Sequence, residues 1–414
     1  MKILHVTPHL GGGIGKVISG LCINDKDNVH EIACLEEPVN RHFFDLCLES
    51  GIKVCLPTEK ELEDLLASAD IVQVEWWHHP LTVEFICKYL DKIQTRLLIW
   101  SHISGCNYPW ISPAFVDFAD TFVFATPFSY DNPYYTQKER DRVRAHAKLV
   151  VSSGNDFRSM VTKRKEHEGF HVGYVGFLGY EKTRPNFVEI CEACADIDGI
   201  KFIIVGDLAY GEELLCDIEK SKHKDKFILK GYSHNVQEEL ADFDVFACLL
   251  NKEHTGASEN ALLEAMNAEV CPIVFKQCTE QYLVQDGVTG IVCDDEDAFV
   301  EAIHLAARDK EYVKHLGKNS GNYIKETLDI QNTVENMRSE YCNLMGKAKS
   351  VHDGVEVFGI TPKEWFLSCY KGDQYNLSGL AIGESKGSIK QYYKYFKDDE
   401  LKVLMEKNDL WDIQ

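Results

Sequence analysis

Residues 244–275 read DVFACLLNKEHTGASENALLEAMNAEVCPIVF, and this stretch decides the fold class. An apolar run of strand length comes first, a loop of small and polar residues follows, a helix-period segment begins near Glu259, and a second apolar run closes the stretch. A strand, a helix and a strand in this order are typical of a parallel βαβ unit. The stretch therefore predicts a sheet of parallel strands that is covered by helices.

The same alternation extends in both directions from this stretch. The strands expected in the first half are Lys2–Val6, Glu31–Leu35, Lys53–Leu56, Ile71–Glu75, Leu97–Ser101, Thr121–Ala125 and Leu149–Ser152. Those expected in the second half are His171–Gly176, Lys201–Val205, Phe227–Lys230, Asp244–Leu249, Cys271–Phe275 and Gly290–Cys293. Helix-period segments lie between many of them. The chain is therefore expected to form two doubly wound α/β units, which would place a ligand cleft between the carboxyl ends of both sheets.

Composition divides the chain into domains. A length of 414 residues exceeds what one hydrophobic core usually supports. The polar segment Thr162–Gly169 has the composition of a linker, so the expected domains are 1–165 and 166–330. Residues 331–350 are expected to form a helix that returns to the first domain. Residues 351–414, where the strand pattern stops, are interpreted as an appendage.

Charge and cysteine usage exclude several classes of protein. The formal net charge of −22 argues against broad binding to a nucleic-acid backbone. The local basic stretch Lys138–Lys148 is more typical of a solvated helix face than of a binding patch. Fifteen cysteines are scattered through apolar runs, as expected for reduced, buried thiols. The single CxxC, Cys191 and Cys194, lacks a second pair at zinc-site spacing. No metal and no cofactor are therefore expected.

No apolar run approaches the roughly 20 residues that span a bilayer, and Met1-Lys2 leads into a short apolar run instead of a signal peptide. We therefore expect a cytoplasmic protein, with peripheral contact at the inner face of the membrane as the alternative.

Three segments carry chemistry. The first, PHLGGGIGK at 8–16, follows the first strand and opens a helix, where backbone N–H groups could meet an anion or could merely pack tightly. The second, GYVGFLGYEKTRPN at 173–186, presents Lys182, a cation that can stabilise a departing diphosphate or be an ordinary surface lysine. The third, TGASENALLEAM at 255–266, leaves N–H groups free at a helix start. Its Glu264 lies among apolar residues, where a carboxylate needs a partner such as a ribose diol or a salt bridge.

Together these segments resemble glycosyltransferase family 4, a family of retaining enzymes with the GT-B fold. The resemblance covers residues 1–345 in order and spacing. Its most specific parts are LLEAM at 262–266, CPIV at 271–274 and DGVTG at 286–290. A looser resemblance connects the chain with a variant subset linked to bacterial surface polysaccharides. The implied fold is GT-B, with two Rossmann-like domains facing a central cleft and a C-terminal appendage.

The resemblance also implies roles for individual residues. Glu264 is similar to the second Glu of the family's E-x7-E motif, which holds the donor ribose. Lys182 corresponds to the residue that binds the donor diphosphate, helped by Arg184. His102, at a strand end, is similar to the family's active-site histidine. The remaining residues implied at the donor diphosphate are Gly12, Gly13, Glu259, Asn260 and Ala261.

The sequence departs from the family pattern at two positions. Gly256 stands where the first Glu of E-x7-E is expected, so another group, Glu259 or Glu253, would have to contact the sugar. Phe177 replaces the usual Arg of the family's G-R-L segment. These departures are compatible with an unusual donor or with lost activity.

The implied reaction is transfer of a sugar, with retention and without a metal, from a nucleotide-sugar donor to a saccharide or lipid-linked acceptor in polysaccharide or glycoconjugate synthesis. Aromatic residues after two first-half strands could line an acceptor groove or pack in the core: Trp76, Trp77, His78 and Trp110. Alternatives left open are a GT-B epimerase or phosphorylase and a catalytically inactive GT-B module that binds a partner. An NAD-dependent oxidoreductase is disfavoured, because the Gly-rich turn lacks its acidic partner.

Overall fold

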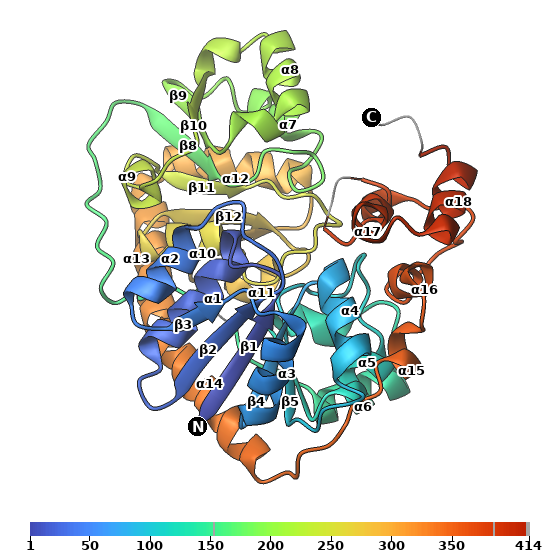
Figure 1. Cartoon of the computed structure of the whole chain (residues 1–414). Coiled ribbons are helices and arrows are strands. Elements are labelled where there is room, and N and C mark those ends of the chain that lie inside the picture. The colour runs from blue at the N-terminus through green and yellow to red at the C-terminus, as the bar shows by residue number, and fades with distance from the viewer. Residues whose placement is uncertain (152–153, 384–385, 411–414) are drawn as a thin grey trace. The chain divides into compact units, whose positions relative to one another are not determined.

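A computed structural model describes residues 1–151, 154–383 and 386–410 (Figure 1). The chain forms two compact units. The first contains Met1–Asn155, Thr255–Ala257 and the chain from Ile330 onward, and the second contains Asp156–His254 and Ser258–Asp329. The sequence placed this boundary after residue 165. The expected linker is attached to the second unit, because the Lys165 backbone N–H donates to the Ala241 carbonyl at 2.8 Å.

The first unit is built on a seven-stranded parallel sheet with the order β3-β2-β1-β4-β5-β6-β7. Its strands are β1 (Lys2–Thr7), β2 (Val29–Cys34), β3 (Lys53–Cys55), β4 (Ile71–Trp76), β5 (Leu97–Ser101), β6 (Thr121–Phe124) and β7 (Lys148–Leu149). All seven predicted strands are confirmed within a few residues, although Ser152 of the last prediction lies outside the described residues. The strand order reverses between β1 and β4, so the binding crevice of this sheet is expected there.

The two faces of this sheet are covered by different helices. The helices between the strands are α1 (Gly12–Asn24), α2 (His42–Glu49), α3 (Glu59–Ser68), α4 (Pro80–Tyr89), α5 (Pro113–Phe118) and α6 (Gln137–His146), with a 3₁₀ turn at Pro127–Asp131. Because side chains alternate along a strand, Ile3 and Ile71 pack on one face against α1 and α14 (Ile330–Met345). Leu4 and Val72 pack on the opposite face with α3 and α4.

The residues after α14 form an appendage that packs on the first unit. Its helices are α15 (Val355–Phe358), α16 (Pro362–Leu367), α17 (Ile389–Phe396) and α18 (Asp399–Lys407), with a 3₁₀ turn at Gly379–Ala381. Figure 1 shows them beside α4 and α5. Phe358, Phe366 and Tyr392 are fully buried in the same core as the helices α3 and α4. The appendage is therefore an integral layer of the first unit.

The second unit repeats the doubly wound plan. Its six-stranded sheet has the order β10-β9-β8-β11-β12-β13, and all its pairs are parallel. The strands are β8 (Phe170–Val175), β9 (Ile200–Val205), β10 (Phe227–Gly231), β11 (Val245–Cys248), β12 (Cys271–Phe275) and β13 (Ile291–Cys293). All six predicted strands are confirmed. The order reverses between β8 and β11, which places the expected binding crevice at the carboxyl ends of these two strands.

The helices of the second unit are α7 (Phe187–Glu192), α8 (Glu212–Lys220), α9 (Val236–Leu240), α10 (Asn260–Asn267), α11 (Glu280–Leu283), α12 (Glu296–Arg308) and α13 (Lys310–Thr327), with 3₁₀ turns at Leu208–Tyr210 and Lys224–Lys226. Gly173 in β8 permits close packing, because a Cβ there would lie 1.9 Å from the Phe243 ring. A side chain at this position would push β8 away from the segment that leads into β11.

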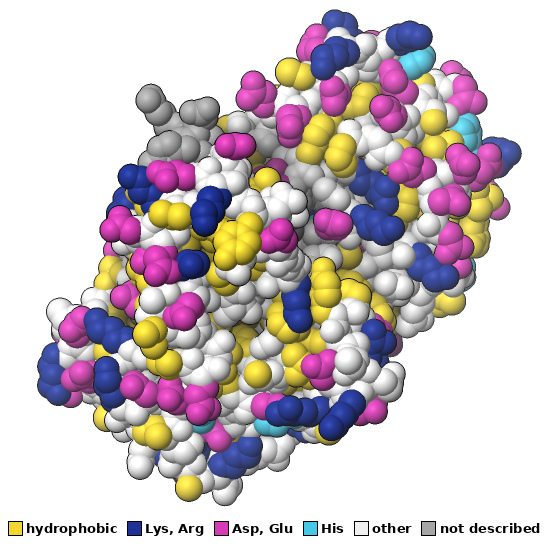
Figure 2. Space-filling view, turned by 90° about the vertical axis from the view of Figure 1, so that its right-hand side faces the viewer, with side chains coloured by type: hydrophobic (Ala, Val, Ile, Leu, Met, Phe, Trp, Pro, Cys, Tyr) yellow, Lys and Arg dark blue, Asp and Glu magenta, His cyan; other side chains and the backbone are white. Residues whose placement is uncertain are grey.

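The surface has mixed charge. On the face drawn in Figure 2, Lys and Arg side chains are interspersed with Asp and Glu. The basic stretch Lys138–Lys148 lies largely on α6, where Arg142 and Arg144 form ion pairs with Asp117 and Asp131. The interpretation of this stretch as a solvated helix face is confirmed. Within the described residues, none of the helices combines the length and the apolar character needed to cross a membrane.

Candidate functional site

A cavity lies at the point where the strand order of the second sheet reverses. Its volume is about 50 Å³, the size of one small group and not of a whole nucleotide. The residues that line it come from the end of β8, the segment after it, the end of β11 and the start of α10: Tyr174, Val175, Gly176, Phe177, Lys182, Phe246, Cys248, Leu250, Glu259, Ala261 and Leu262. The sequence-predicted residues Lys182, Glu259 and Ala261 are thus brought together.

Four charged side chains form a connected group beside this cavity. We call Lys182, His254, Glu259 and Glu280 the Lys182 cluster. Lys182 Nζ lies 2.6 Å from Glu259 Oε1, and His254 Nδ1 lies 3.4 Å from the same oxygen. His254 Nε2 lies 3.0 Å from Glu280 Oε1, and both of these side chains are fully buried. The cluster therefore places two cationic groups next to the cavity, each balanced by a carboxylate.

The pKa values of the cluster follow from burial and charge. Burial lowers the pKa of His254, but the Glu280 and Glu259 carboxylates and a hydrogen bond with Cys278 together outweigh it, and the pKa is raised to about 10. Burial raises the pKa of Glu259, while the charges of Lys182 and His254 outweigh it and hold this pKa below its ordinary value. His254 is therefore an imidazolium at neutral pH, and Glu259 is a carboxylate.

The raised pKa of His254 predicts how stability depends on pH. Because the folded-state pKa lies above its ordinary value of 6.5, the stabilisation is complete below about pH 6.5 and is lost as the pH rises through about 10. Within this window the free energy of unfolding is expected to fall by up to about 1.4 kcal/mol per pH unit. Urea unfolding at a series of pH values measures this slope.

The matched variants are His254→Gln and His234→Gln, since His234 is an exposed histidine of the same unit. The first should remove the slope and the second should retain it. An unchanged slope in His254→Gln would show that His254 is not the titrating group.

The start of α10 supplies the other half of this site. Glu259, the residue before the helix, has φ 39° and ψ 67°, a left-handed conformation that is costly for a residue with a side chain. The Oδ1 atom of Asn260, the first helical residue, is buried without a hydrogen-bond partner among the described residues. The first N–H groups of an α-helix have no intrahelical partner. Glu264, predicted to hold a ribose, is buried on the same helix and is 7% exposed.

The Arg184 side chain, which was predicted to help bind the donor diphosphate, contacts residues in and near β12 and α12. Its guanidinium donates to Glu296 at 2.9 Å and to Gln277 at 3.1 Å, and it lies 3.7 Å above the Phe275 ring. These three contacts hold the Arg184 side chain against β12 and α12. The structure therefore gives Arg184 a structural role in this conformation and does not place it with the cavity-lining residues.

In the first unit, Gly12 and Gly13 open α1 directly after β1, and both are exposed. Gly12 has φ 58°, and a Cβ there would meet nothing within 4 Å. The Gly-rich turn thus offers open backbone in a conformation that favours glycine. Its role toward a donor remains a prediction.

His102 follows β5 and is held by a buried carboxylate. Its Nε2 lies 2.7 Å from Glu75 Oε2, while Glu75 Oε1 accepts from His5 at 2.7 Å and from Gln73 at 2.8 Å. Burial raises the pKa of Glu75, but the hydrogen bonds from His102 and His5 outweigh it and lower the pKa to about 2. A permanently charged Glu75 fixes the proton of His102 on Nε2, so that Nδ1 is the nitrogen left for other partners.

This network continues through the core to α14. His5 Nε2 lies 2.8 Å from His30 Nδ1, and His30 Nε2 lies 3.2 Å from Asp25 Oδ2. Asp25 in turn accepts from Arg338 of α14 at 2.7 Å. A second branch runs from Tyr341 of α14 to Gln73 at 2.6 Å. The position of His102 is therefore tied to α14 by two chains of buried hydrogen bonds.

The predicted acceptor aromatics are largely core residues. Trp76 is fully buried, with its ring centroid 4.4 Å from that of Phe115, and Trp77 is 1% exposed. His78 is buried beside Tyr392 of α17. Trp110 is half-buried, with Lys371 3.9 Å above its ring. In this structure the appendage covers these rings, so the core-packing alternative describes Trp76, Trp77 and His78, and only Trp110 keeps a partly open face.

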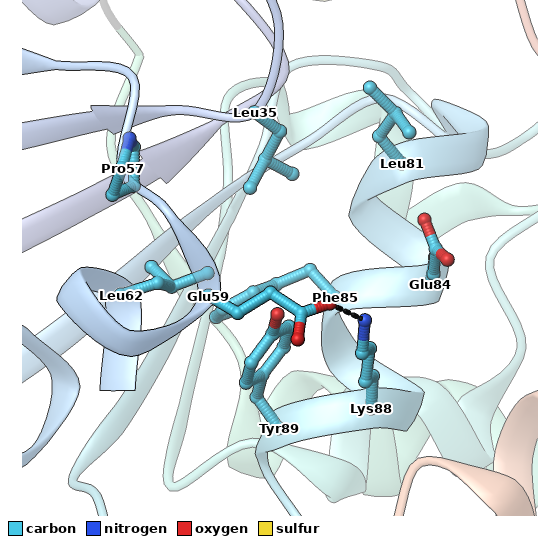
Figure 3. A pocket seen from close by; sticks show the side chains of 9 residues that line it. All are labelled: Leu35, Pro57, Glu59, Leu62, Leu81, Glu84, Phe85, Lys88 and Tyr89. Carbon is cyan, nitrogen blue, oxygen red and sulfur yellow. Dashed lines mark hydrogen bonds and ion pairs between the residues drawn. The ribbon is translucent and has the colours of Figure 1, made fainter.

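A larger hollow in the first unit has a volume of about 160 Å³ (Figure 3). It lies between α3 and α4, and its apolar side chains include Leu35, Leu81 and Phe85. Glu59 and Lys88 form an ion pair at its mouth. None of the sequence-predicted site residues lines it.

Several groups of described residues have the composition of a metal site. One is His254, Cys278 and Glu280, in which His254 and Glu280 already pair with each other at 3.0 Å. Another is His5, Cys22 and His30, whose histidines already hydrogen-bond to each other and to Glu75 and Asp25. The two thiols of the CxxC are buried, and burial raises the pKa of Cys194 to about 12. These observations favour structural roles for all three groups of side chains.

The sequence did not single out His254, Glu280 or Glu75 as members of a site. Glu75 stands inside an apolar strand run, which is a signal that could have been used, because a carboxylate at such a position must find buried partners. His254 and Glu280 are 26 residues apart in the chain and meet only through the fold.

Comparisons with known proteins agree with this architecture. Residues 157–323 match the model of the family Glycosyl transferases group 1. No curated protein matches the sequence. HepE from Anabaena, in complex with UDP, is a similar solved structure, with 14% identity, a TM-score of 0.68 and coverage of 83% of this chain and 100% of that chain.

Sucrose-phosphate synthase from Thermosynechococcus elongatus is also similar, with 14% identity, a TM-score of 0.63 and coverage of 84% and 99% of the two chains. The apo form of WaaB, a lipopolysaccharide outer core galactosyltransferase, has 16% identity, a TM-score of 0.58 and coverage of 82% and 100%. These likenesses concern the fold, which is GT-B as the sequence predicted.

Proposed function

We propose that this chain is a glycosyltransferase that takes a sugar from a nucleoside-diphosphate donor and transfers it to a saccharide or lipid-linked hydroxyl. The observation that carries this proposal is the cavity of the second unit. Lys182 and the start of α10 meet there, at the reversal point of a doubly wound sheet, where such sheets bind ligands. A cation and free helix N–H groups are the groups that a diphosphate requires.

In this proposal each residue has a role that follows from the chemistry of its side chain or backbone. Lys182 and the N–H groups around Asn260 stabilise the charge that develops on the departing diphosphate. Glu264 accepts hydrogen bonds from the two ribose hydroxyls. The unpartnered Oδ1 of Asn260 is a further acceptor for a donor hydroxyl. His102, oriented by Glu75, contacts the transferred sugar through Nδ1.

Finer features come from the resemblance to glycosyltransferase family 4 and belong to the same proposal. They are retention of the donor's anomeric configuration, metal-independent transfer and a role in bacterial surface polysaccharide or glycoconjugate synthesis. HepE, whose fold is similar to that of this chain, was solved in complex with UDP, so UDP is the first nucleotide to test.

Product analysis tests the proposal. The full chain is incubated with UDP-, GDP- and ADP-glucose, with and without methyl glycosides, and the products are followed by NMR. Release of nucleoside diphosphate with formation of a new glycosidic bond of the donor's configuration is expected. A changed sugar that stays on the nucleotide, or free nucleotide without an acceptor product, indicates an epimerase, and phosphate consumption indicates a phosphorylase.

A catalytically inactive GT-B module is the second candidate, because Lys182 is already paired with Glu259 in this structure. In that case Lys182 would be a structural cation, and none of the nucleotide sugars would be turned over. The same incubation separates the two candidates.

A further inference from the structure

A polar cluster lies where the strand order of the first sheet reverses. His9 follows β1, Glu36 follows β2 and His79 follows β4, so the carboxyl ends of three neighbouring strands contribute to it. Tyr395, from α17 of the appendage, completes it. We call these four residues the strand-end cluster. It lies beside one of the predicted acceptor aromatics, because the Trp77 ring centroid is 5.7 Å from that of His9 and 6.1 Å from that of His79.

Glu36 is the centre of the cluster. Its Oε2 accepts a hydrogen bond from the Tyr395 hydroxyl at 2.6 Å. Its Oε1 lies 3.5 Å from His79 Nε2 and 4.0 Å from His9 Nε2. The Glu36 and His9 side chains are 27% and 24% exposed, so the cluster is open to solvent although His79 is buried. Both imidazoles lie near Oε1, at distances longer than an ordinary hydrogen bond.

Backbone N–H groups determine which nitrogen of each imidazole carries the proton. The Gly11 N–H donates to His9 Nδ1 at 3.1 Å, and the Leu81 N–H donates to His79 Nδ1 at 3.3 Å. Each Nδ1 therefore uses its lone pair, and in the neutral ring the proton sits on Nε2, which faces Glu36. A metal ion bound at Nε2 would force a proton onto Nδ1 against a backbone N–H. The cluster therefore presents N–H donors and is unsuited to a metal.

The neutral state of both rings is consistent with their surroundings. Burial, and then the charge of Lys386, lowers the pKa of His9 to about 4. Burial, followed by the proximity of His9, lowers the pKa of His79 to about 3. Near neutral pH the strand-end cluster thus combines two neutral N–H donors, a carboxylate acceptor and a phenol.

Donors and acceptors at this spacing suit a sugar ring with several hydroxyls, since one carboxylate can accept from two hydroxyls while the imidazoles donate to their oxygens. We propose that the strand-end cluster binds the saccharide acceptor and that the appendage is part of this binding site through Tyr395. This inference rests on the proposed glycosyltransferase function and adds the acceptor residues to it. Leu35, the chain neighbour of Glu36, and Leu81, whose backbone N–H donates to His79 Nδ1, both line the hollow of Figure 3.

Binding of methyl glycosides tests the inference on the full chain. Methyl α-glucoside, methyl α-galactoside and methyl N-acetyl-α-glucosaminide are titrated into the wild type and into Glu36→Gln and Tyr395→Phe, with affinities measured by NMR. Tyr393→Phe on the same helix is the matched control. UDP affinity and thermal unfolding are measured for each variant.

At least one glycoside is expected to bind the wild type. Glu36→Gln should weaken it by about tenfold or more, since a hydrogen bond to a charged group is lost. Tyr395→Phe should weaken it about threefold, because the lost hydrogen bond only orients Glu36. Tyr393→Phe should leave the affinity unchanged, and all variants should bind UDP as the wild type does.

Other outcomes overturn the inference in distinguishable ways. UDP binding together with glycoside affinities that Glu36→Gln leaves unchanged, or with no glycoside binding at all, refutes the acceptor site and leaves the proposed function standing. Binding of neither UDP nor any other nucleoside diphosphate refutes the proposed function itself. Saturable Zn²⁺ binding that His79→Gln abolishes would show that the cluster is a metal site.

Discussion

Replacing Lys182 by alanine is expected to lower the rate of sugar transfer by about 10²- to 10³-fold, the usual loss when one preorganised group that stabilises developing charge is removed. Lys182 lines the cavity of the second unit, and its side chain is 27% exposed. In the proposed reaction it meets the departing diphosphate, whose charge is larger in the transition state than in the bound donor. The loss should therefore appear mainly in kcat, with a smaller loss in donor affinity.

Lys252→Ala is the matched control, because Lys252 is an exposed lysine in the loop after β11. Steady-state kinetics with the donor found by product analysis compare the two variants. If Lys182→Ala and Lys252→Ala have the same kcat, Lys182 is only the structural partner of Glu259, and its catalytic assignment is wrong.

Replacing Glu75 by alanine is expected to lower the free energy of unfolding by about 3–5 kcal/mol, the cost of breaking a buried charged pair. His5, Gln73 and His102 all donate to this carboxylate, and Glu75 is fully buried. Without it, three buried donors lose their acceptor, and no water can easily replace it. Urea unfolding measures the loss, and Glu63→Ala at an exposed position of α3 should stay within about 0.5 kcal/mol of the wild type.

The isosteric variant Glu75→Gln separates stability from positioning. Its amide offers only one oxygen, so its NH₂ group faces a donor of either His102 or the pair His5 and Gln73. The protein should fold, while the preferred tautomer of His102 changes, which ¹⁵N NMR of the imidazole detects. The rate of sugar transfer should fall together with this change of the His102 tautomer. Wild-type stability for Glu75→Ala would contradict the central place of Glu75 in the network.

The fold could be predicted because its evidence is local. Each buried parallel strand is a short apolar run, and each crossover helix has its own period, so DVFACLL and CPIVF were located without knowledge of any contact. The loop that bears Lys182 and the start of α10 were assigned to one diphosphate site by the resemblance to glycosyltransferase family 4, and both follow strands whose carboxyl ends meet at one sheet edge.

The remaining features depend on contacts between distant segments. Trp76 ends β4 and Trp77 follows it, where either an acceptor groove or core packing was expected, and the appendage covers this position and buries both rings. The appendage has no strand pattern, so its packing position could not be read from periodicity. Arg184 was predicted from the resemblance to help Lys182 at the donor diphosphate, which stays a prediction, and its contacts with Glu296 and Phe275 come from segments distant in the sequence.

The proposed function requires the second unit to bind a nucleoside diphosphate through α10. Thermal and urea unfolding of the full chain with UDP, GDP, ADP and CMP test it directly, using the wild type, Glu264→Ala and the exposed control Glu213→Ala. One nucleoside diphosphate at 100 times its dissociation constant should stabilise the wild type and the control by about 2.7 kcal/mol. Glu264→Ala should lose most of this stabilisation. If none of the nucleotides stabilises the wild type, or if Glu264→Ala responds like the control, the claim is contradicted.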